Sequence, residues 1–484
     1  MTNGRVHRTG SRTPAVKVGR FPESRRAFDP PLASSTTHPV GPLGGRGLAR
    51  SPVGISASLL LAITILLLIS ITFRQDESAE DLDLQVAVRA VGYSLAALVA
   101  LFALFRGKMR ISIPIGIWLL VPLVIIGTAL YAPSPAYAVT GGLAHLAVLL
   151  FAWHFVNSQG AARAMLLLIL TGTIIGIASI FAYFAFPDLG RSIATAIEAD
   201  PGGRMKGVTG QANALGMICA LTVLLAVTSY SDLGHRRILV AAVAIVVGAV
   251  CLISSDSRTA MAALASCLLL WTLWKRNPAI NLFVIVAIAL VGCAILTFVP
   301  DVAPYLTRTG SRADDLATLN GRREIWDVVS EGIRAHPFLG EGYGASRVFL
   351  PQDDRLFLAA VNAHNVFLEL LYSGGLLLLL LYATGVGWSL IRNLRRMQVA
   401  PLIALIFFLV IGTTTSTPYA GLPLFPAIAF YVVVACSLGA RTAGAALRWS
   451  PRLAGERPRL PDWRRKMPQA GLGQTVAVDK SGSE

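Results

Sequence analysis

Long apolar stretches recur along most of this chain, and they constrain its fold more than any other feature. Each stretch has about 17 to 25 residues, the length that an α-helix needs to cross the hydrocarbon core of a bilayer. They lie near 53–73, 86–105, 111–130, 137–156, 164–186, 211–229, 238–254, 259–274, 280–299, 366–391, 399–417 and 423–440. The sequence therefore predicts an all-α polytopic membrane protein with about twelve transmembrane helices and both termini on one side.

Lysine and arginine predict the orientation, because basic residues near span ends are retained in the cytoplasm. They collect in the N-terminal tail, at Arg106, Lys108 and Arg110, at Arg236 and Arg237, at Lys275 and Arg276, at Arg392, Arg395 and Arg396, and after Arg441. The segment 74–84, on the opposite side, is acidic. We therefore expect two cytoplasmic basic, disordered tails over 1–52 and 441–484, and a membrane domain over 53–440 whose large 300–365 loop lies outside the cytoplasm.

The formal net charge of +16 raises the question of a nucleic acid partner. The arginines of the tails are interspersed with Pro, Gly and Ser and show no zinc, helix-turn-helix or aromatic-platform pattern, so we expect no nucleic acid. Topology and the anionic headgroups of membrane lipids explain the charge better. The five cysteines all lie within predicted spans and form no CxxC pair, which indicates small core residues.

The one long polar segment inside this apolar chain lies between Val299 and Val366. Since 54% of the residues are hydrophobic, the chain has little other polar surface. A site for a charged or sugar-like substrate is therefore expected in this loop or at nearby helix ends.

Within the loop, residues 321–334 have the pattern of an amphipathic helix, with Asn320 as N-cap and Pro337 ending it. At 100° per residue, Arg322 falls in the middle of the apolar face and Arg323 among the solvated charges. An arginine on the packed side needs an anionic partner, because burying an unpaired guanidinium is costly. The apolar face otherwise consists of Ile325, Trp326, Val329 and Ile333.

The segment 339–344 contains three glycines. It is too rich in glycine for a helix or a strand interior, so we expect a tight surface turn. Because it lacks the flanking strand and the Lys-Ser/Thr ending of a phosphate loop, we expect no nucleotide binding there.

Arg204, Arg258 and Arg322, with His364, form a basic set that topology places on one side of the membrane. Guanidinium groups pair bidentately with phosphate oxygens and stay charged, as binding of a diphosphate leaving group requires. Each arginine taken alone is more simply interpreted as a snorkelling or headgroup-binding residue. Three of them next to Gly-rich turns favour a site.

His364 precedes the span that begins near Asn365. An imidazole there could act as a base toward an acceptor hydroxyl or donate to a phosphate oxygen. Spacing alone allows a structural interfacial histidine equally well. Asn365 could cap the following helix, and Glu369 could orient His364 or merely face a polar crevice.

Other candidates carry weaker signals. Arg89, one turn inside the second span, either reaches the same cavity or snorkels outward. His145 and His154, in the fourth span, are expected to be hydrogen-bonded packing residues. The acidic pairs at 314–315 and 353–354 have no third ligand, so we expect neither a metal site nor a cofactor.

The order of several short motifs resembles the O-antigen ligase and polymerase family of bacterial membrane proteins. The motifs are Arg204-Met205-Lys206-Gly207 with Gln211-Ala212-Asn213, Ser257-Arg258-Thr259, Gly321-Arg322 with Trp326, Gly340-Glu341-Gly342-Tyr343-Gly344, and His364-Asn365 with Gly375. The resemblance covers about residues 50 to 440. It departs from the family at Gln211-Ala212, where relatives often have Pro before the Asn, which puts the role of Asn213 in doubt.

The resemblance implies a GT-C-like, metal-independent glycosyltransferase of the inner membrane that acts at the periplasmic face. Its donor would be an undecaprenyl-diphosphate-linked glycan, and its acceptor a glycan or lipid A-core hydroxyl, with inversion at the transferred sugar. By this resemblance Arg204, Arg258 and Arg322 would hold the diphosphate, and His364 would be the base or another diphosphate contact. From the positions of the other candidates we also expect Arg89, Asn213, Trp326, Asn365 and Glu369 to bind substrate.

Three functions remain open at this point: ligation of finished glycan, polymerisation of repeat units in O-antigen or exopolysaccharide, and transport of a lipid-linked sugar by a flippase. Transporters tend to place polar residues near the bilayer midplane, on broken helices in two related halves. Here the polar residues gather at one surface and no duplicated half is visible, which favours an enzyme. We expect a ligase first and a polymerase second.

Overall fold

The computed structural model describes residues 56–72, 84–109, 111–192, 203–230, 238–274, 322–356 and 360–439. The chain divides into two units, Met1–Gly54 and Ile55–Glu484, and every described residue belongs to the second. The predicted tails at 1–52 and 441–484, the span at 280–299 and the cap Asn320 lie outside the described residues.

The described part of the chain is helical and contains no strand, so the predicted all-α class is confirmed. The helices are α1 (Ala57–Ser70), α2 (Leu84–Phe105), α3 (Ile113–Gly127), η1 (Thr128–Leu130), α4 (Pro135–Gln159), α5 (Ala161–Ala185), α6 (Pro187–Gly190), η2 (Gly207–Thr209), α7 (Ala212–Thr228), α9 (Ile238–Ser254), α10 (Arg258–Trp274), α14 (Arg322–Ala335), α15 (Ala345–Phe349), η4 (Leu350–Gln352), α16 (Val366–Arg396), α17 (Val399–Gly412) and α18 (Phe425–Leu438).

Five of these segments are long and apolar enough to cross a membrane: α2, α3 with η1, α4, α5 and α16. Six shorter apolar helices accompany them: α1, α7, α9, α10, α17 and α18. Together they coincide with every predicted stretch except 280–299. Their length and composition support the membrane class, and the count of twelve stays a prediction.

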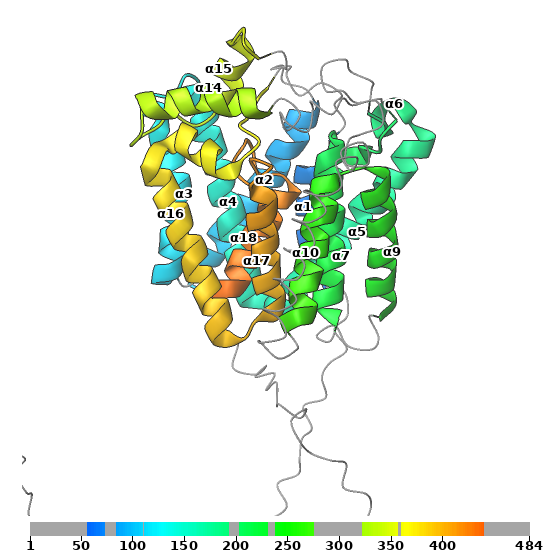
Figure 1. Ribbon diagram of the computed structural model, residues 1–484. Coiled ribbons are helices and arrows are strands. Elements are labelled where there is room, and N and C mark those ends of the chain that lie inside the picture. Colours follow the sequence, from blue (N-terminus) through cyan, green and yellow to red (C-terminus); the bar gives the residue numbers. More distant parts are fainter. Residues whose placement is uncertain are drawn as a thin grey trace, which may run out of the picture. The chain divides into compact units, whose positions relative to one another are not determined.

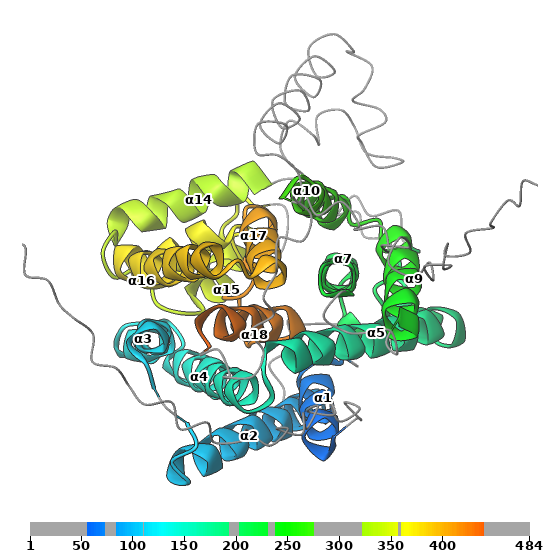
Figure 2. The ribbon, with the colours of Figure 1, turned by 90° about the horizontal axis from the view of Figure 1, so that it is seen from below.

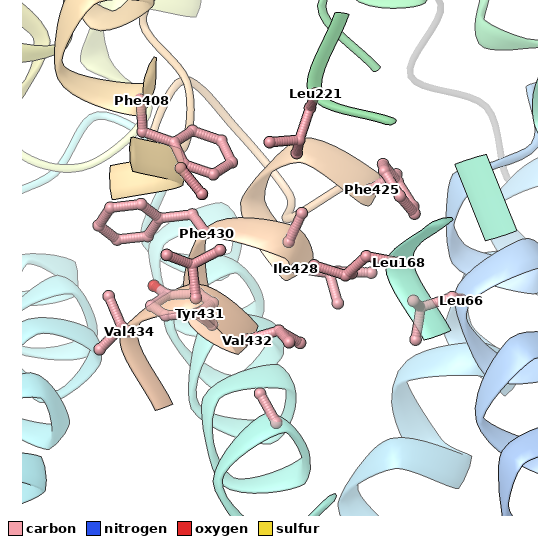
Figure 3. Packing of buried hydrophobic residues seen from close by; sticks show 14 of the residues in the cluster. Leu66, Leu168, Leu221, Phe408, Phe425, Ile428, Phe430, Tyr431, Val432 and Val434 are labelled. Carbon is pink, nitrogen blue, oxygen red and sulfur yellow. The ribbon is translucent and has the colours of Figure 1, made fainter. Parts of the chain in front are cut away.

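Helix α18 lies inside the bundle, between α4, α5, α16 and α17 (Figure 2). All of its residues are buried, as expected of a helix that is apolar all round. Phe430 packs there against Phe408 of α17, and Ile428 lies beside Leu168 of α5 in the same buried cluster (Figure 3). The segment 413–424, which leads into α18, is therefore fixed at the middle of one end of the bundle.

Helices α6, α14 and α15 lie at that same end (Figure 1). Backbone hydrogen bonds join its connecting segments, such as the bond from the Thr72 N–H to the Val208 carbonyl at 2.7 Å and from the Met205 N–H to the Ser254 carbonyl at 2.9 Å. The segments 203–213, 255–259, 322–356 and 360–365 thus meet at one end, as their predicted common side requires. We call it the polar end.

Helix α16 is broken at Gly375, where φ is 61° and ψ is −162°. A turn from residues 336–341 fills the break. The N–H of Glu341 donates to the Tyr372 carbonyl at 2.7 Å, and the N–H of Leu376 donates to the Pro337 carbonyl at 2.8 Å. The stretch predicted as one span from 366 to 391 therefore has two parts, and the part before the break belongs to the polar end.

The expectation of a surface turn at 339–344 is wrong, because Gly342, Tyr343 and Gly344 are buried. Gly340, Gly342 and Gly344 have φ values of 70°, 96° and 84°, a region that favours glycine. A Cβ on Gly340 would lie 2.6 Å from the Tyr372 carbonyl oxygen. The glycines thus allow the backbone to enter the break in α16.

Candidate functional site

The amphipathic helix predicted at 321–334 is confirmed as α14. Ile325 and Val329 are buried, Arg323 is exposed and Arg322 is half-buried, as the helical phase predicts. Two adjacent arginines therefore have different environments.

The guanidinium of Arg322 makes no hydrogen bond and no ion pair with any other described residue. Burial lowers its pKa from the ordinary value. A guanidinium that is partly removed from water without a counter-charge is costly, and an anion brought from outside would offset that cost. Arg322 is thus suited to binding an anionic ligand.

His364 lies close to Arg322. Burial, and in second place the charge of Arg322, lowers the pKa of His364 from 6.5 to about 4. Its imidazole forms no hydrogen bond within the described ranges of the chain, whereas its backbone N–H donates to Asn362 Oδ1 at 2.9 Å. At neutral pH this histidine is therefore uncharged and has a free lone pair.

Trp326 and Glu369 both bind the residue that precedes His364. The indole Nε1–H of Trp326 donates to the Ala363 carbonyl at 2.9 Å. The Ala363 N–H donates to Glu369 Oε2 at 2.8 Å, while the Ser346 hydroxyl donates to Glu369 Oε1 at 2.7 Å. Glu369 thus contacts the backbone beside His364 and not the imidazole.

Asn365 caps α16, as predicted. Its Oδ1 accepts from the N–H groups of Phe367 at 2.9 Å and Leu368 at 3.2 Å. Its Nδ2 donates to the Thr413 carbonyl at 3.2 Å, and its N–H donates to Ser416 Oγ at 3.2 Å. The side chain is therefore used at both ends within the fold.

Arg204 and Asn213 build the turn between α9 and α10. The Nε of Arg204 donates to the Ser255 carbonyl at 2.9 Å, and its Nη2 donates to Asn213 Oδ1 at 3.0 Å and to the Asp256 carbonyl at 3.3 Å. These bonds connect the 203–213 segment to the end of α9. Arg204 therefore has a structural role in addition to any role in binding a ligand.

Arg258 is more exposed. It is the first residue of α10, its side chain is 44% exposed, and its Nε lies 3.9 Å from Asp256 Oδ1. An ion pair of this length between exposed side chains contributes little to stability. The guanidinium thus keeps much of its surface at the polar end.

Arg89 reaches the polar end from α2. Its Nη2 donates to Thr72 Oγ1 at 2.8 Å, and Thr72 in turn bonds to Val208. Its Nε is buried and has no hydrogen-bond partner among the described residues. Arg89 is thus bonded to the end of α1, and its reach into a substrate cavity stays a prediction.

A buried network that the sequence did not suggest lies beneath these residues. His145 Nε2 donates to the Gly421 carbonyl at 3.2 Å, which leaves Nδ1 to accept from the Tyr431 hydroxyl at 2.9 Å. The Tyr343 hydroxyl donates to the same carbonyl at 2.6 Å. His145 is thus a hydrogen-bonded packing residue, as predicted, and it fixes the 413–424 segment that carries Ser416.

No group of three His, Cys, Asp or Glu residues in the described part of the chain could hold a metal ion. The carboxylate of Asp353 is occupied by Arg355, at 2.8 to 2.9 Å. Four of the cysteines, those at 219, 251, 267 and 436, are buried free thiols, as their positions in spans predicted.

The fold and the polar end define an all-helical membrane protein with a cationic site at one end of its bundle. Residues 242–383 match the family model described as O-antigen ligase, which supports the resemblance noted in the sequence. No curated protein sequence matches the chain significantly. The matched segment includes Arg258, Arg322, Trp326, His364, Asn365 and Glu369, whereas Arg89, Arg204 and Asn213 precede it.

Proposed function

We propose that this protein transfers a glycan from undecaprenyl diphosphate to an acceptor hydroxyl at the periplasmic face of the inner membrane, as an O-antigen ligase would. The observation that carries the proposal is the pairing of Arg322, which has no anionic partner among the described residues, with the neutral imidazole of His364. The O-antigen ligase match over the same residues supports it.

Arg322 would bind the diphosphate of the donor, assisted by Arg258. Charge-assisted hydrogen bonds from guanidinium to phosphate are strong, and they strengthen as charge develops on the leaving group. Hydrogen bonds to Thr72 and to the Ser255 carbonyl already hold the side chains of Arg89 and Arg204. These two arginines would therefore contribute positive electrostatic potential to the site and no direct contact with the phosphate. The donor is thus bound by its leaving group.

His364 would act as the general base. The acceptor oxygen attacks the anomeric carbon and forms the new glycosidic bond, the hydroxyl proton passes to the imidazole, and the bond from the sugar to the diphosphate breaks. Undecaprenyl diphosphate leaves with the electron pair. No nucleotide sugar is needed.

The low pKa of His364 suits this order of events. In the free protein burial and, in second place, the charge of Arg322 keep the imidazole neutral, so it is ready to accept a proton. A bound diphosphate would offset the charge of Arg322 and raise the pKa of His364, which makes it a stronger base only when the donor is present.

The same donor site would serve a polymerase, since ligation and polymerisation of repeat units differ only in the acceptor. A flippase is the third candidate, because α16 is a broken helix like those of transporters. The chain's own turn fills that break, however, and the cationic groups gather at one end of the bundle, which favours an enzyme.

Gels of surface polysaccharide from a deletion strain test the proposal. Full-length glycan that accumulates on its lipid carrier would indicate a ligase, and single-repeat products would indicate a polymerase. Stably inserted His364→Ala and Arg322→Ala proteins should fail to restore the normal pattern, whereas Arg323→Ala should restore it. Full restoration by the first two would refute an enzymatic role and leave a transporter.

A further inference from the structure

We infer that Glu369 is a positioning residue: it does not itself touch the substrate, but holds the backbone of Ala363 so that the imidazole of His364 faces Arg322. The inference rests on the proposed function, in which His364 is the base. It assigns to Glu369 a role different from the substrate contact expected from its position in the sequence.

The carboxylate of Glu369 is removed from solvent and fully engaged. The residue is 2% exposed, and its oxygens accept from the Ala363 N–H at 2.8 Å, the Ser346 hydroxyl at 2.7 Å and the Ser373 hydroxyl at 3.4 Å. No cation lies within ion-pair distance of it among the described residues. A buried carboxylate is retained only where hydrogen bonds compensate its desolvation, and here they go to the chain beside His364.

His364 needs such support because of its backbone. Its φ of 46° is in the left-handed region, which residues with a side chain rarely adopt. Such a conformation persists only where the surroundings impose it. Without the bond to Ala363, the turn could relax and carry the imidazole away from Arg322.

The turn is held from both sides. Trp326 binds the Ala363 carbonyl, Glu369 binds the Ala363 N–H, and Asn362 Oδ1 accepts from the His364 N–H. The Asn365 N–H donates to Ser416, which also donates to Asn362. Among these partners Glu369 alone joins the turn to α15, through Ser346, so the carboxylate connects α15, α16 and the histidine.

Its place in α16 also favours a carboxylate. Glu369 lies in the first turn of the helix, where the positive end of the helix dipole stabilises a negative charge. The same dipole would disfavour a cation at this position, which agrees with a role in holding N–H and hydroxyl donors.

Kinetics of the purified protein in lipid nanodiscs test the inference, with Glu369→Ala, Glu369→Gln and, as a matched control, Glu331→Ala. Glu331 is an exposed carboxylate on α14 that pairs with Arg355. We expect Glu369→Ala to lower kcat at least about tenfold, while KM for the donor stays within about twofold. Glu369→Gln should recover most of kcat, because its amide oxygen can accept from Ala363 and its NH2 can donate to Ser346. The control should match the wild type.

Equal kcat per folded molecule in Glu369→Ala and wild type would overturn the inference, and so would a failure of Glu369→Gln to recover more than Glu369→Ala. If Glu369→Ala does not insert stably, Ser346→Ala serves instead, since it removes one of the carboxylate's donors and keeps the bond to Ala363. Ser346→Ala should lower kcat measurably but by less than about tenfold, with KM unchanged. An unchanged kcat would count against the inference.

Amide hydrogen exchange over residues 360–366 gives a readout that does not depend on activity. Exchange there should be faster in Glu369→Ala than in wild type. If exchange responds but His364→Ala still transfers glycan, the proposed function fails while the support of the turn stands. If His364→Ala is inactive but Glu369→Ala shows wild-type amide exchange and wild-type kcat, the positioning role of Glu369 is refuted while the proposed function stands.

Discussion

The protonation of His364 leads to the sharpest prediction. Its pKa is about 4 because of burial first and the charge of Arg322 second. Lowering the pKa of an imidazole from 6.5 to about 4 corresponds to at most about 3 kcal/mol of preference for the neutral form, since the half-buried ring keeps some contact with solvent. Neutral His364 is the active form, so kcat/KM should be level near neutral pH and fall only as the pH approaches about 4.

Arg322→Gln is the perturbation that separates the two causes. Burial, the larger cause, remains, so the acid-side midpoint of kcat/KM should rise above 4 but stay closer to 4 than to 6.5. The rate itself should fall about a hundredfold, because a charged partner of the diphosphate is lost. Arg323→Gln, the exposed neighbour, should leave both the rate and the midpoint unchanged.

The assay is glycan transfer by the purified protein in nanodiscs from about pH 3.5 to 8, with the pKa of His364 followed separately by deuterium exchange at its C2–H. The free energy of unfolding should also depend on pH through the protonation of His364. Because the folded pKa lies below the unfolded one, the unfolded state binds more protons between pH 4 and 6.5, and stability is lost as the pH falls through that window. A wild-type midpoint near 6.5 in either measurement would refute the reasoning.

Three further predictions concern single positions. Gly375→Ala places a Cβ against the Phe338 carbonyl carbon at a φ of 61°, so it should lower the free energy of unfolding by about 2 to 4 kcal/mol. The control Gly387→Ala, in the same helix, meets no atom within 4 Å and should be neutral or slightly stabilising. Similar losses of stability in both variants would contradict the account of the broken helix. Asn365→Ala removes the cap of α16 and should destabilise by about 1 kcal/mol in the same assay; an unchanged melting temperature would argue against the cap. Arg258→Gln should lower transfer about tenfold without changing the melting temperature, because its own ion pair is long and exposed, and an unfolding defect would show a structural role instead.

Much of the fold was predictable because membrane helices are a local property of sequence. Apolar length alone marked the described spans, and the 100° helical phase alone separated Arg322 from Arg323. The cap at Asn365 was predictable for the same reason, since a side chain that bonds two residues ahead needs no distant partner.

The contacts that shape the site were not predictable, because they join distant positions. Trp326 and Ala363 are 37 residues apart, and His145 and Gly421 are 276 apart, yet each pair is hydrogen-bonded. The periodicity of α14 assigned Trp326 to an apolar face without showing that its N–H holds the turn before His364. The glycines at 339–344 likewise predicted a turn, but at the surface. The turn is buried because it enters the break in α16, and the sequence around 339–344 contains no information about a break in a different helix.

Transfer of a glycan by the purified protein from an undecaprenyl-diphosphate donor to an acceptor is the most direct test of the central claim. The wild type and Arg323→Ala should form product at equal rates, and Arg322→Ala and His364→Ala should lose activity by about a hundredfold or more. Equal loss in both arginine variants, or full transfer by His364→Ala, would contradict the account.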